Sequence, residues 1–435
     1  MKSGRLIASC LLVSLCLAGS WYLLPRIFVK IPALPFTQQV YVWQMHWDDA
    51  VHQAIIRAEP QVDGFMLLAG EVGYDGKDFS FLSASPDRRG IAKPVTIVLR
   101  IRSEFSKALA QRQTAAATSY ILDRLEPHLG SGQDAASRPG VQIDFDCPTS
   151  AVAEYAEFLR SLRSALPGRQ LSITTLPDWL NSTAFPALLA TVDCFVLQVH
   201  SLENPATVKT PYVLCDPIKA AHWVERASRI GVQFYVALPT YSYRLLFDQQ
   251  GRFRSIIAEQ TAQSPAPGMI AKEVSADPAA LARLARQWRD QPPDNCRGVV
   301  WFRLPVDGDR RNLPWRAFAS LLKGIAPSTS FAADMRQPEP GLYELWLSNT
   351  GDYAPANPVS CEVRWTKDAL LAYDIIGGYK GSGALGQDTV QVEGPAPEAN
   401  GQPKMAGWFR VRPENNEDKE TVQCSAVHVI GSPDS

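Results

Sequence analysis

Two carboxylates in an otherwise apolar segment are the residues of this sequence best placed to do chemistry. Residues 140–146 read Gly-Val-Gln-Ile-Asp-Phe-Asp, so that Gln142, Asp144 and Asp146 alternate with apolar side chains. In a β-strand, this spacing of two puts the three polar side chains on one face. Two neighbouring carboxylates whose environments differ can act as a proton donor and a charged partner, as glycoside hydrolysis requires. The segment therefore predicts an acid–base site at the end of a strand.

Two arginines lie on the polar face of a second predicted strand. In residues 94–102 the apolar side chains fall on one side, which leaves Arg100 and Arg102 on the other. An arginine next to Asp144 favours the charged form of that carboxylate. The alternative is a buried layer of salt bridges without catalysis, because structural ion-pair networks perturb carboxylates as active sites do.

The elements that must position these residues alternate between short apolar strands and helices. Such alternation indicates a parallel sheet covered by helices. Strands are predicted at residues 40–46, 64–69, 94–102, 140–146, 170–175, 194–200, 233–238 and 298–304. Eight units between residues 37 and 323 fit a (β/α)8 TIM barrel, which typically takes about 250 residues. A doubly wound open sheet is the rival, but no Gly-rich nucleotide loop follows the first strand, and no cofactor is predicted.

Helix starts and stripes support this pattern. Asp216-Pro217 and Asp277-Pro278 are typical of helix N-termini, since proline is favoured at the first helical position. In the helix after residue 146, Tyr155, Phe158, Leu159 and Leu162 form an apolar stripe. In a TIM barrel, chemistry is done at the C-terminal ends of the strands, where Asp146 lies.

The chain beyond residue 323 has a different pattern. Residues 324–340 contain several prolines and are predicted to be a linker. Residues 341–435 show alternating strands and no helix, which is typical of a β-sandwich module.

Residues 1–25 form an export signal or a membrane anchor. Lys2 and Arg5 precede the uncharged stretch from Leu6 to Leu24. Cleavage is expected after Ser20, or the stretch remains as an anchor in the inner membrane, because about 20 apolar residues span a bilayer. Either outcome predicts a periplasmic or extracytoplasmic protein.

Export places the cysteines in an oxidising compartment. Of the eight, six lie beyond the signal. We expect Cys361 to pair with Cys424 in the C-terminal module, and Cys147 to pair with Cys215 at the top of the barrel. No cysteine–histidine spacing of a zinc site is present, so no metal is predicted.

Composition excludes one class of partner. The 43 lysines and arginines balance 44 acidic residues, and no basic run follows the first residues. A nucleic-acid binder needs a dense basic surface, so nucleic acid is not expected as a partner. The oligomeric state is not indicated.

The strand at 140–146 resembles the fourth strand of the chitinase-like family-eighteen glycoside hydrolases, Gly-φ-Asp-φ-Asp-φ-Glu, where φ is apolar. The final Glu of the family motif falls on Asp146, the middle Asp on Asp144 and the first Asp on Gln142. The resemblance implies that Asp146 is the general acid. It also implies that Asp144 orients the substrate's acetamido group. Asp146 is one methylene shorter than the family's Glu.

Three further segments agree with this resemblance. Gln198-Val199-His200 stands where the family has a Met-x-Tyr motif, Ala237 to Tyr241 matches a Gly-φ-Pro-x-Tyr motif, and Trp301 matches a tryptophan that floors the sugar pocket. The layout is also similar to the bacterial Domain of Unknown Function 3142 family. The resemblance implies that Gln142, Gln198, His200, Tyr241 and Trp301 shape a sugar site, with Arg100 and Arg102 beside it.

The leading interpretation is a glycoside hydrolase-like protein of the bacterial cell envelope. It would act on a polysaccharide or amino-sugar polymer by general acid catalysis. The alternative is a non-catalytic carbohydrate-binding or scaffold protein on the same fold, since this barrel hosts many functions. Both interpretations predict a carbohydrate ligand.

Overall fold

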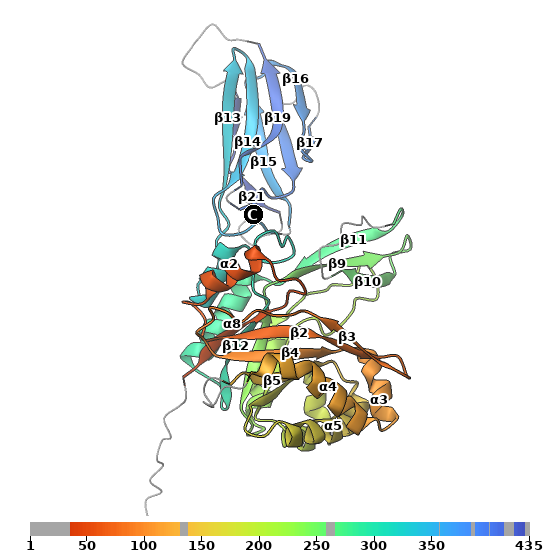
Figure 1. Cartoon of the computed structure of the whole chain (residues 1–435). Helices are drawn as coiled ribbons and strands as arrows, with labels where there is room; N and C mark the ends of the chain where they lie inside the picture. Colours follow the sequence, from red (N-terminus) through yellow and green to blue (C-terminus); the bar gives the residue numbers. More distant parts are fainter. Residues whose placement is uncertain are drawn as a thin grey trace, which may run out of the picture. The chain divides into compact units, whose positions relative to one another are not determined.

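The structure is a computed structural model (Figure 1). It describes residues 35–130, 138–257, 266–355, 357–383, 388–399, 401–412 and 422–430. The predicted signal or anchor therefore lies outside the described residues. Within them, no helix has the length and apolar character needed to cross a membrane.

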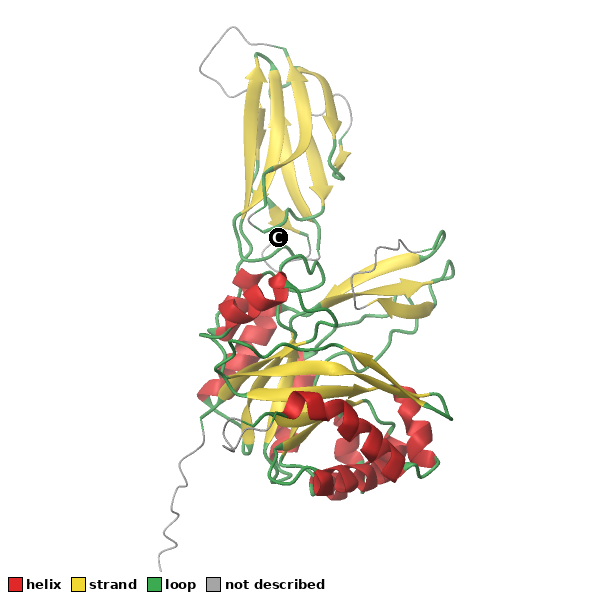
Figure 2. Cartoon of the chain, in the orientation of Figure 1, coloured by secondary structure: helices red, strands yellow, loops and turns green. Residues whose placement is uncertain are grey.

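Residues 36–322 contain a closed barrel of eight parallel strands (Figure 2). Hydrogen bonding joins the strands in the order β1-β12-β8-β7-β6-β5-β4-β2, and β2 pairs with β1 to close the ring. The strands are β1 (Thr37–Val42), β2 (Gly64–Tyr74), β4 (Val95–Ile101), β5 (Gly140–Phe145), β6 (Leu171–Thr175), β7 (Cys194–Gln198), β8 (Phe234–Pro239) and β12 (Cys296–Phe302). The predicted TIM barrel is confirmed.

Helices connect most of these strands and supply the outer layer. They are α2 (Asp49–Ala58), α3 (Ser106–Ala110), α4 (Thr114–Leu129), α5 (Val152–Ala165), α6 (Phe185–Leu189), α7 (Pro217–Ser228), α8 (Pro278–Asp290) and α9 (Trp315–Leu322). As predicted, Asp216 and Asp277 cap α7 and α8, each accepting from backbone N–H groups of the first turn. The stripe predicted on α5 is fully buried.

The barrel has two separate apolar regions, because successive side chains of each strand point in opposite directions. Outward-facing side chains, such as Ile143 of β5, join the helices in the large core. Inward-facing side chains make a smaller cluster in the lumen, which includes Tyr41, Trp43, Val98 and Val300. The polar side chains Gln142 and Asp144 of β5 have the inward parity, as predicted.

Two antiparallel additions to the barrel were not predicted. Strand β3 (Phe79–Ser83) pairs with the extended second half of β2, where Gly70 (φ 155°) accommodates the close approach of Phe81 and Leu82. Strands β9 (Ser242–Phe247), β10 (Phe253–Ile257) and β11 (Ile270–Ser275) form a small sheet between β8 and α8. The alternation of aromatic and polar residues at 79–83 was a usable signal for β3.

The C-terminal region is all-β, as predicted. One sheet has the order β13-β14-β19-β16, and the other contains β17-β18-β15-β20 with β21 paired to β15. The strands are β13 (Phe331–Glu339), β14 (Leu342–Asn349), β15 (Val359–Trp365), β16 (Leu370–Ile375), β17 (Lys380–Ser382), β18 (Thr389–Gly394), β19 (Lys404–Val411), β20 (Val422–Cys424) and β21 (His428–Val429). Side chains of both sheets share one core, which includes Leu345, Phe409, Val363 and Val390.

The predicted linker at residues 324–340 is partly a strand. β13 occupies residues 331–339 and pairs with β14 at the edge of its sheet. Pro338 lies in this strand, and an edge strand tolerates a proline because one side of it carries no ladder. The prolines had suggested a linker because proline is uncommon inside the strands of a sheet.

The two predicted disulfides are not formed in the structure, where all six described cysteines are free. The thiols of Cys361 and Cys424 are hydrogen-bonded to one another, and this contact lowers the pKa of Cys361. The Cys147 thiol instead donates to the carbonyl of Pro148. Burial raises the pKa of Cys147 and Cys215 to about 12. In the barrel, Cys147 and Cys215 both lie in the apolar core.

Candidate functional site

One arginine at the mouth of the barrel is surrounded by three carboxylates. Arg100 of β4 lies 3.4 Å from Asp144, 3.8 Å from Asp146 and 3.9 Å from Glu71, measured between nitrogen and oxygen atoms. Burial alone would lower the pKa of Arg100, but the three carboxylates outweigh it and raise that pKa. The guanidinium also lies over the ring of Trp43, 5.9 Å from the centroid.

Asp144 is the most firmly held of the three carboxylates. The Thr174 hydroxyl of β6 donates to its Oδ1 at 2.6 Å, and Arg100 Nη1 donates to its Oδ2. The residue is only 7% exposed. Strands on either side of β5 therefore orient Asp144, since Arg100 comes from β4 and Thr174 from β6.

Asp146 lies just past the end of β5 and has a different environment. Burial and the negative charge of Asp144 raise the pKa of Asp146 to about 6, although Arg100 opposes the increase. Its side chain is nevertheless 48% exposed, so a ligand can reach the carboxyl group. A carboxyl group that holds a proton near pH 6 and is open to solvent can act as a general acid.

Glu71 joins the cluster because β2 is longer than predicted. The residue lies beyond the predicted strand at 64–69 and is the register partner of Arg100. The pairing of β2 with β4 shifts by one residue between Leu68 and Gly70. Such a bulge changes which side chains point inward. Sequence alternation alone does not reveal a one-residue shift.

Aromatic rings surround the cluster on the β1, β8 and β12 side. The Trp43 and Phe302 centroids are 4.9 Å apart, and Tyr241 lies 5.5 Å from Phe302. His200 stacks on Phe302 at 5.9 Å. These rings form an apolar wall beside a charged site, a combination suited to the faces and hydroxyl groups of sugars.

His200 is a buried, neutral member of this wall. Its Nδ1 lies 3.4 Å from the Tyr241 hydroxyl, and its Nε2 has no hydrogen-bond partner among the described residues. Burial lowers the pKa of His200 to about 3. The imidazole therefore does not change its charge between pH 5 and 8. Burial also raises the pKa of Tyr241, to about 12, so that its hydroxyl stays protonated.

Two predicted site residues lie outside the cluster. Trp301 faces outward, where its ring is 6.1 Å from that of Phe318 on α9 and its Nε1 donates to Gln38. It is fully buried in the large core and does not line the mouth, whereas the neighbouring Phe302 packs against the lumen cluster. Arg102 pairs with Glu104 at 2.9 Å instead of with Asp144. It follows the last residue of β4, where the strand parity no longer holds.

Two glutamines occupy intermediate positions. Gln142 is fully buried one layer below Asp144, where it accepts from the Tyr41 hydroxyl at 2.7 Å and donates to Ser172. It therefore supports the site from below. Gln198 ends β7, and its Nε2 donates to the carbonyl of His200 at 3.2 Å. It holds the segment that carries His200.

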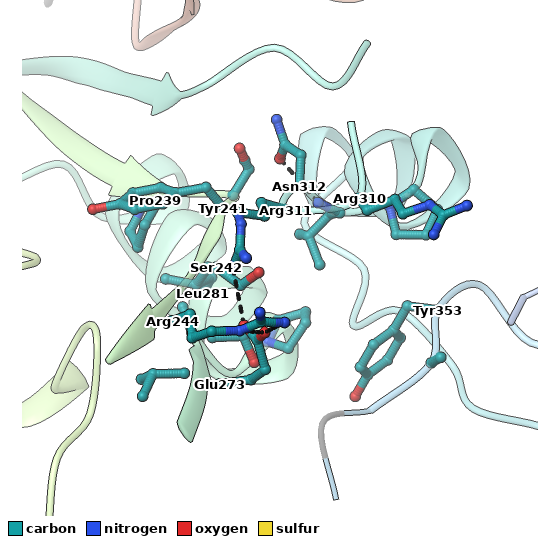
Figure 3. A pocket seen from close by; sticks show the side chains of 18 residues that line it. Pro239, Tyr241, Ser242, Arg244, Glu273, Leu281, Arg310, Arg311, Asn312 and Tyr353 are labelled. Carbon is teal, nitrogen blue, oxygen red and sulfur yellow. Dashed lines mark hydrogen bonds and ion pairs between the residues drawn. The ribbon is translucent and has the colours of Figure 1, made fainter. Parts of the chain in front are cut away.

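A cavity of about 410 Å³ adjoins Tyr241 and was not predicted (Figure 3). Its wall comes from the end of β8, the added β9–β11 sheet, the start of α8, the loop residues 310–314 after β12, and residues 353 and 354. Glu273 binds Arg244 at 2.6 Å and Arg311 at 3.1 Å within this wall. Tyr241 belongs to both the cavity and the aromatic wall, so the cavity adjoins the mouth of the barrel. None of the three clustered carboxylates lines it. Among the described residues, no group of three acidic, cysteine or histidine side chains could hold a metal ion.

The fold and the site together define a class of protein: a (β/α)8 barrel with a carboxylate cluster at the carboxyl ends of its strands. Residues 91–307 match the family described as Domain of unknown function (DUF3142). The resemblance to that family, predicted from the sequence, is confirmed over these residues. No curated protein matches the chain at a significant level.

Solved structures similar to this chain are chitinase-like barrels. A chitinase from Chromobacterium violaceum is 12% identical, with a TM-score of 0.47, over 66% of this chain and 98% of that chain. The spore cortex-lytic enzyme SleL of Bacillus cereus is 14% identical, with a TM-score of 0.43, over 67% and 74% of the two chains. A GH18 chitinase, ChiB, from Flavobacterium johnsoniae is 14% identical, with a TM-score of 0.44, over 68% and 94%.

Proposed function

We propose that the protein is a glycoside hydrolase of the bacterial cell envelope that acts on a polysaccharide or amino-sugar polymer by general acid catalysis. The observation that carries this proposal is the contrast between two carboxylates two residues apart. Asp144 is buried and bound by Thr174 and Arg100, whereas Asp146 is accessible and has a pKa raised to about 6. This difference supports Asp146 as the proton donor and Asp144 as the charged partner.

The reaction begins with Asp146 protonated and its carboxyl group directed at the glycosidic oxygen. Proton transfer to that oxygen assists departure of the leaving sugar, while positive charge develops at the anomeric carbon. The negative charge of Asp144 stabilises that charge, either directly or through an acetamido group of the substrate. Water then forms a bond to the anomeric carbon and gives up a proton to Asp146, which completes the hydrolysis and restores the acid. Arg100 and Thr174 hold Asp144 in place throughout, so its position does not depend on the bound sugar.

The aromatic wall supplies the sugar-binding surface. Phe302 is partly buried and replaces Trp301 as the aromatic residue of β12 at the mouth. Tyr241 contributes a protonated hydroxyl group that can bond a sugar hydroxyl. Trp43 contacts Arg100 and Phe302 and so joins the wall to the carboxylate cluster.

The proposal includes a location outside the cytoplasm. Residues 6–24 carry no charge and follow Lys2 and Arg5, which is the pattern of an export signal. We propose that the barrel lies beyond the inner membrane, either tethered by this stretch or released from it. A reporter fused after residue 40 should then be active only outside the cytoplasm, and activity confined to the cytoplasm would contradict this part of the proposal.

One observation favours a second candidate function, non-catalytic carbohydrate binding. Arg100 contacts all three carboxylates of the cluster, so their negative charge is partly compensated within the protein. A compensated cluster is also what a structural salt-bridge network would contain. On this alternative the same mouth binds a glycan and releases it unchanged.

The test is a panel of glycans assayed for both binding and cleavage. Purified protein is mixed with chitin oligosaccharides, peptidoglycan fragments and neutral glucans, and new reducing ends are measured beside calorimetric binding. Cleavage that is lost in Asp146→Asn but kept in Asp178→Asn supports the hydrolase. Asp178 is a suitable control because it is an exposed aspartate outside the cluster. Binding without cleavage of any glycan supports the second candidate.

A further inference from the structure

A second large cavity lies at the end of the barrel opposite the carboxylate cluster. It has a volume of about 970 Å³ and is lined by the starts of the parallel strands, among them Thr37 of β1, Val95 of β4 and Gly140 of β5. Because all barrel strands run in the same direction, their N-terminal ends share this face. The cavity is therefore separate from the proposed sugar site.

The lining of this cavity is strongly basic. Its cationic side chains are Arg88, Arg89, Lys93, Arg138 and Arg169. Asp63 is the one carboxylate among the described lining residues, and its Oδ2 already accepts from the backbone N–H of Gln38 at 2.8 Å. Arg89 is paired with Asp87 at 2.6 Å. Arg88, Lys93 and Arg169 add further positive charge to the lining.

Three of these arginines are close enough to affect one another. Burial lowers the pKa of Arg169, and the charges of Arg138 and Arg88 lower it further. Arg169 also donates to the carbonyls of Pro139 and Gly130. The pKa of the half-buried His128 is lowered mainly by burial and further by the charge of Arg88. Cations that are held together at an energetic cost form a preorganised site for an anion.

The chain enters the barrel at this same face. Thr37, the first residue of β1, lines the cavity. The 12 residues from Pro25 to Phe36 separate it from the uncharged stretch at residues 6–24. Fully extended, 12 residues span at most about 40 Å. Residues 6–24, if they are retained in the membrane, are joined to Thr37 by at most this length of chain.

We propose that this basic cavity binds the phosphate group of anionic phospholipids and so docks the N-terminal face of the barrel on the membrane. Arginine forks match phosphate oxygens in a bidentate manner, and Lys93 adds a point charge. Docking by this face would leave the carboxylate cluster, at the other end of the barrel, facing away from the membrane. The inference rests on the proposed export and on retention of residues 6–24, and it does not require that the site at the mouth be catalytic.

The test uses the full chain in a non-ionic detergent. Calorimetric titration compares short-chain phosphatidylglycerol, short-chain phosphatidylcholine and inorganic phosphate. We expect phosphatidylglycerol to bind at least tenfold more tightly than either of the others. Arg88→Gln and Lys93→Gln should each weaken that binding by about fivefold, the usual effect of one basic residue on anionic lipid.

Arg229→Gln is the matched control. It removes the same charge at the C-terminal end of α7, which lies toward the same face of the barrel, but Arg229 does not line the cavity. Its affinity for phosphatidylglycerol should equal that of the unaltered protein. Circular dichroism of each variant shows whether it is folded.

Three results would overturn the inference. Equal affinities for phosphatidylglycerol and phosphatidylcholine exclude recognition of the anionic headgroup. Inorganic phosphate binding as tightly as the lipid assigns the cavity to a free anion instead of the membrane. Unchanged lipid affinity in folded Arg88→Gln and Lys93→Gln variants places the lipid elsewhere. Glycan cleavage is measured in the same samples, so that failure of the hydrolase and failure of lipid binding are seen separately.

Discussion

Arg100 and Asp144 are register partners on the neighbouring strands β4 and β5, and their side chains meet at 3.4 Å inside the mouth of the barrel. This contact organises the site. From its place beside Asp144, Arg100 also reaches Asp146 and Glu71, so one guanidinium links carboxylates from β2, from β5 and from the loop after β5. The chemistry that we propose depends on how this single cation divides its attraction between Asp144 and Asp146.

Replacing Asp146 by asparagine should abolish turnover and preserve binding. The amide keeps the shape of the carboxyl group but has no acidic proton to transfer. General acid catalysis contributes roughly 100- to 10,000-fold to rate, so kcat should fall by at least about 100-fold. Affinity for the glycan, measured by calorimetry, should change by less than about twofold. Full activity in Asp146→Asn would assign the acid to another residue, with Glu71 the next to test.

The pH profile of kcat/KM should have a descending limb near pH 6. The reason is that Asp146, whose pKa is raised to about 6, must be protonated to act as the acid, and it loses that proton as the pH rises. Arg100→Gln removes the cation that opposes this increase, so the limb should move to higher pH. Arg102→Gln is the control, because Arg102 pairs with Glu104 and not with the cluster. A limb that stays in place in Arg100→Gln contradicts the assignment.

The same pKa predicts a cost in stability. In the folded protein Asp146 holds its proton up to about pH 6, whereas an aspartate in the unfolded chain loses its proton near pH 4. Stability contributed by this group is therefore present below pH 4 and is lost as the pH rises toward 6. Asp146→Asn should melt at a higher temperature than the unaltered protein at pH 7.5 and at a similar temperature below pH 4. The difference in Tm between the two proteins, followed by calorimetry against pH, checks this.

Trp301 should matter for stability and not for sugar binding. Trp301→Phe leaves a small void beside Phe318 and removes the partner of Gln38. We expect the free energy of unfolding to fall by about 2 kcal/mol, as for other partly truncated core side chains. Urea unfolding measures this value. Phe302→Leu, on the next residue and inside the mouth, is the comparison: it should weaken glycan binding. Impaired glycan binding in Trp301→Phe would restore Trp301 to the site.

Cys361 and Cys424 should form a disulfide when the protein is isolated from an oxidising compartment. Their thiols are already in contact in the C-terminal module. In the chain-entropy model, closing a loop between these positions stabilises by about 4 kcal/mol. Peptide mapping without reduction should find the two cysteines linked, and the Cys361→Ser variant should be less stable than the oxidised protein. Free thiols at both positions in the oxidised sample would reject the pairing.

Much of the barrel was readable from local pattern. Alternating apolar strands and capped helices predicted the eight units, since a strand buried between lumen and helices must be apolar on its outer face. Parity alone put Asp144 and Arg100 on the inner face, because the side-chain period of a strand is two. The sequence also distinguished Asp146 as the last carboxylate of the segment 140–146, at the strand end where barrel chemistry is done.

Other features depended on the boundaries and partners of the strands. Trp301 and Phe302 are adjacent, and a one-residue choice of register decides which of them faces the lumen. Glu71 entered the cluster through a bulge in β2, and Arg102 left it because β4 ends at Ile101. The added β9–β11 sheet, which builds the cavity beside Tyr241, had no counterpart in the barrel pattern.

The sequence by itself determined the fold class and the inward parity of Asp144, because these follow from local periodicity. The resemblance to the chitinase-like family, and not periodicity, pointed to Asp146 as the candidate acid. Tertiary structure alone decided that one guanidinium serves three carboxylates, that Asp146 has a raised pKa while remaining accessible, and that five basic side chains converge at the opposite face. The physical reason is that burial and Coulomb interactions depend on distances between residues far apart in the chain, which no local pattern specifies.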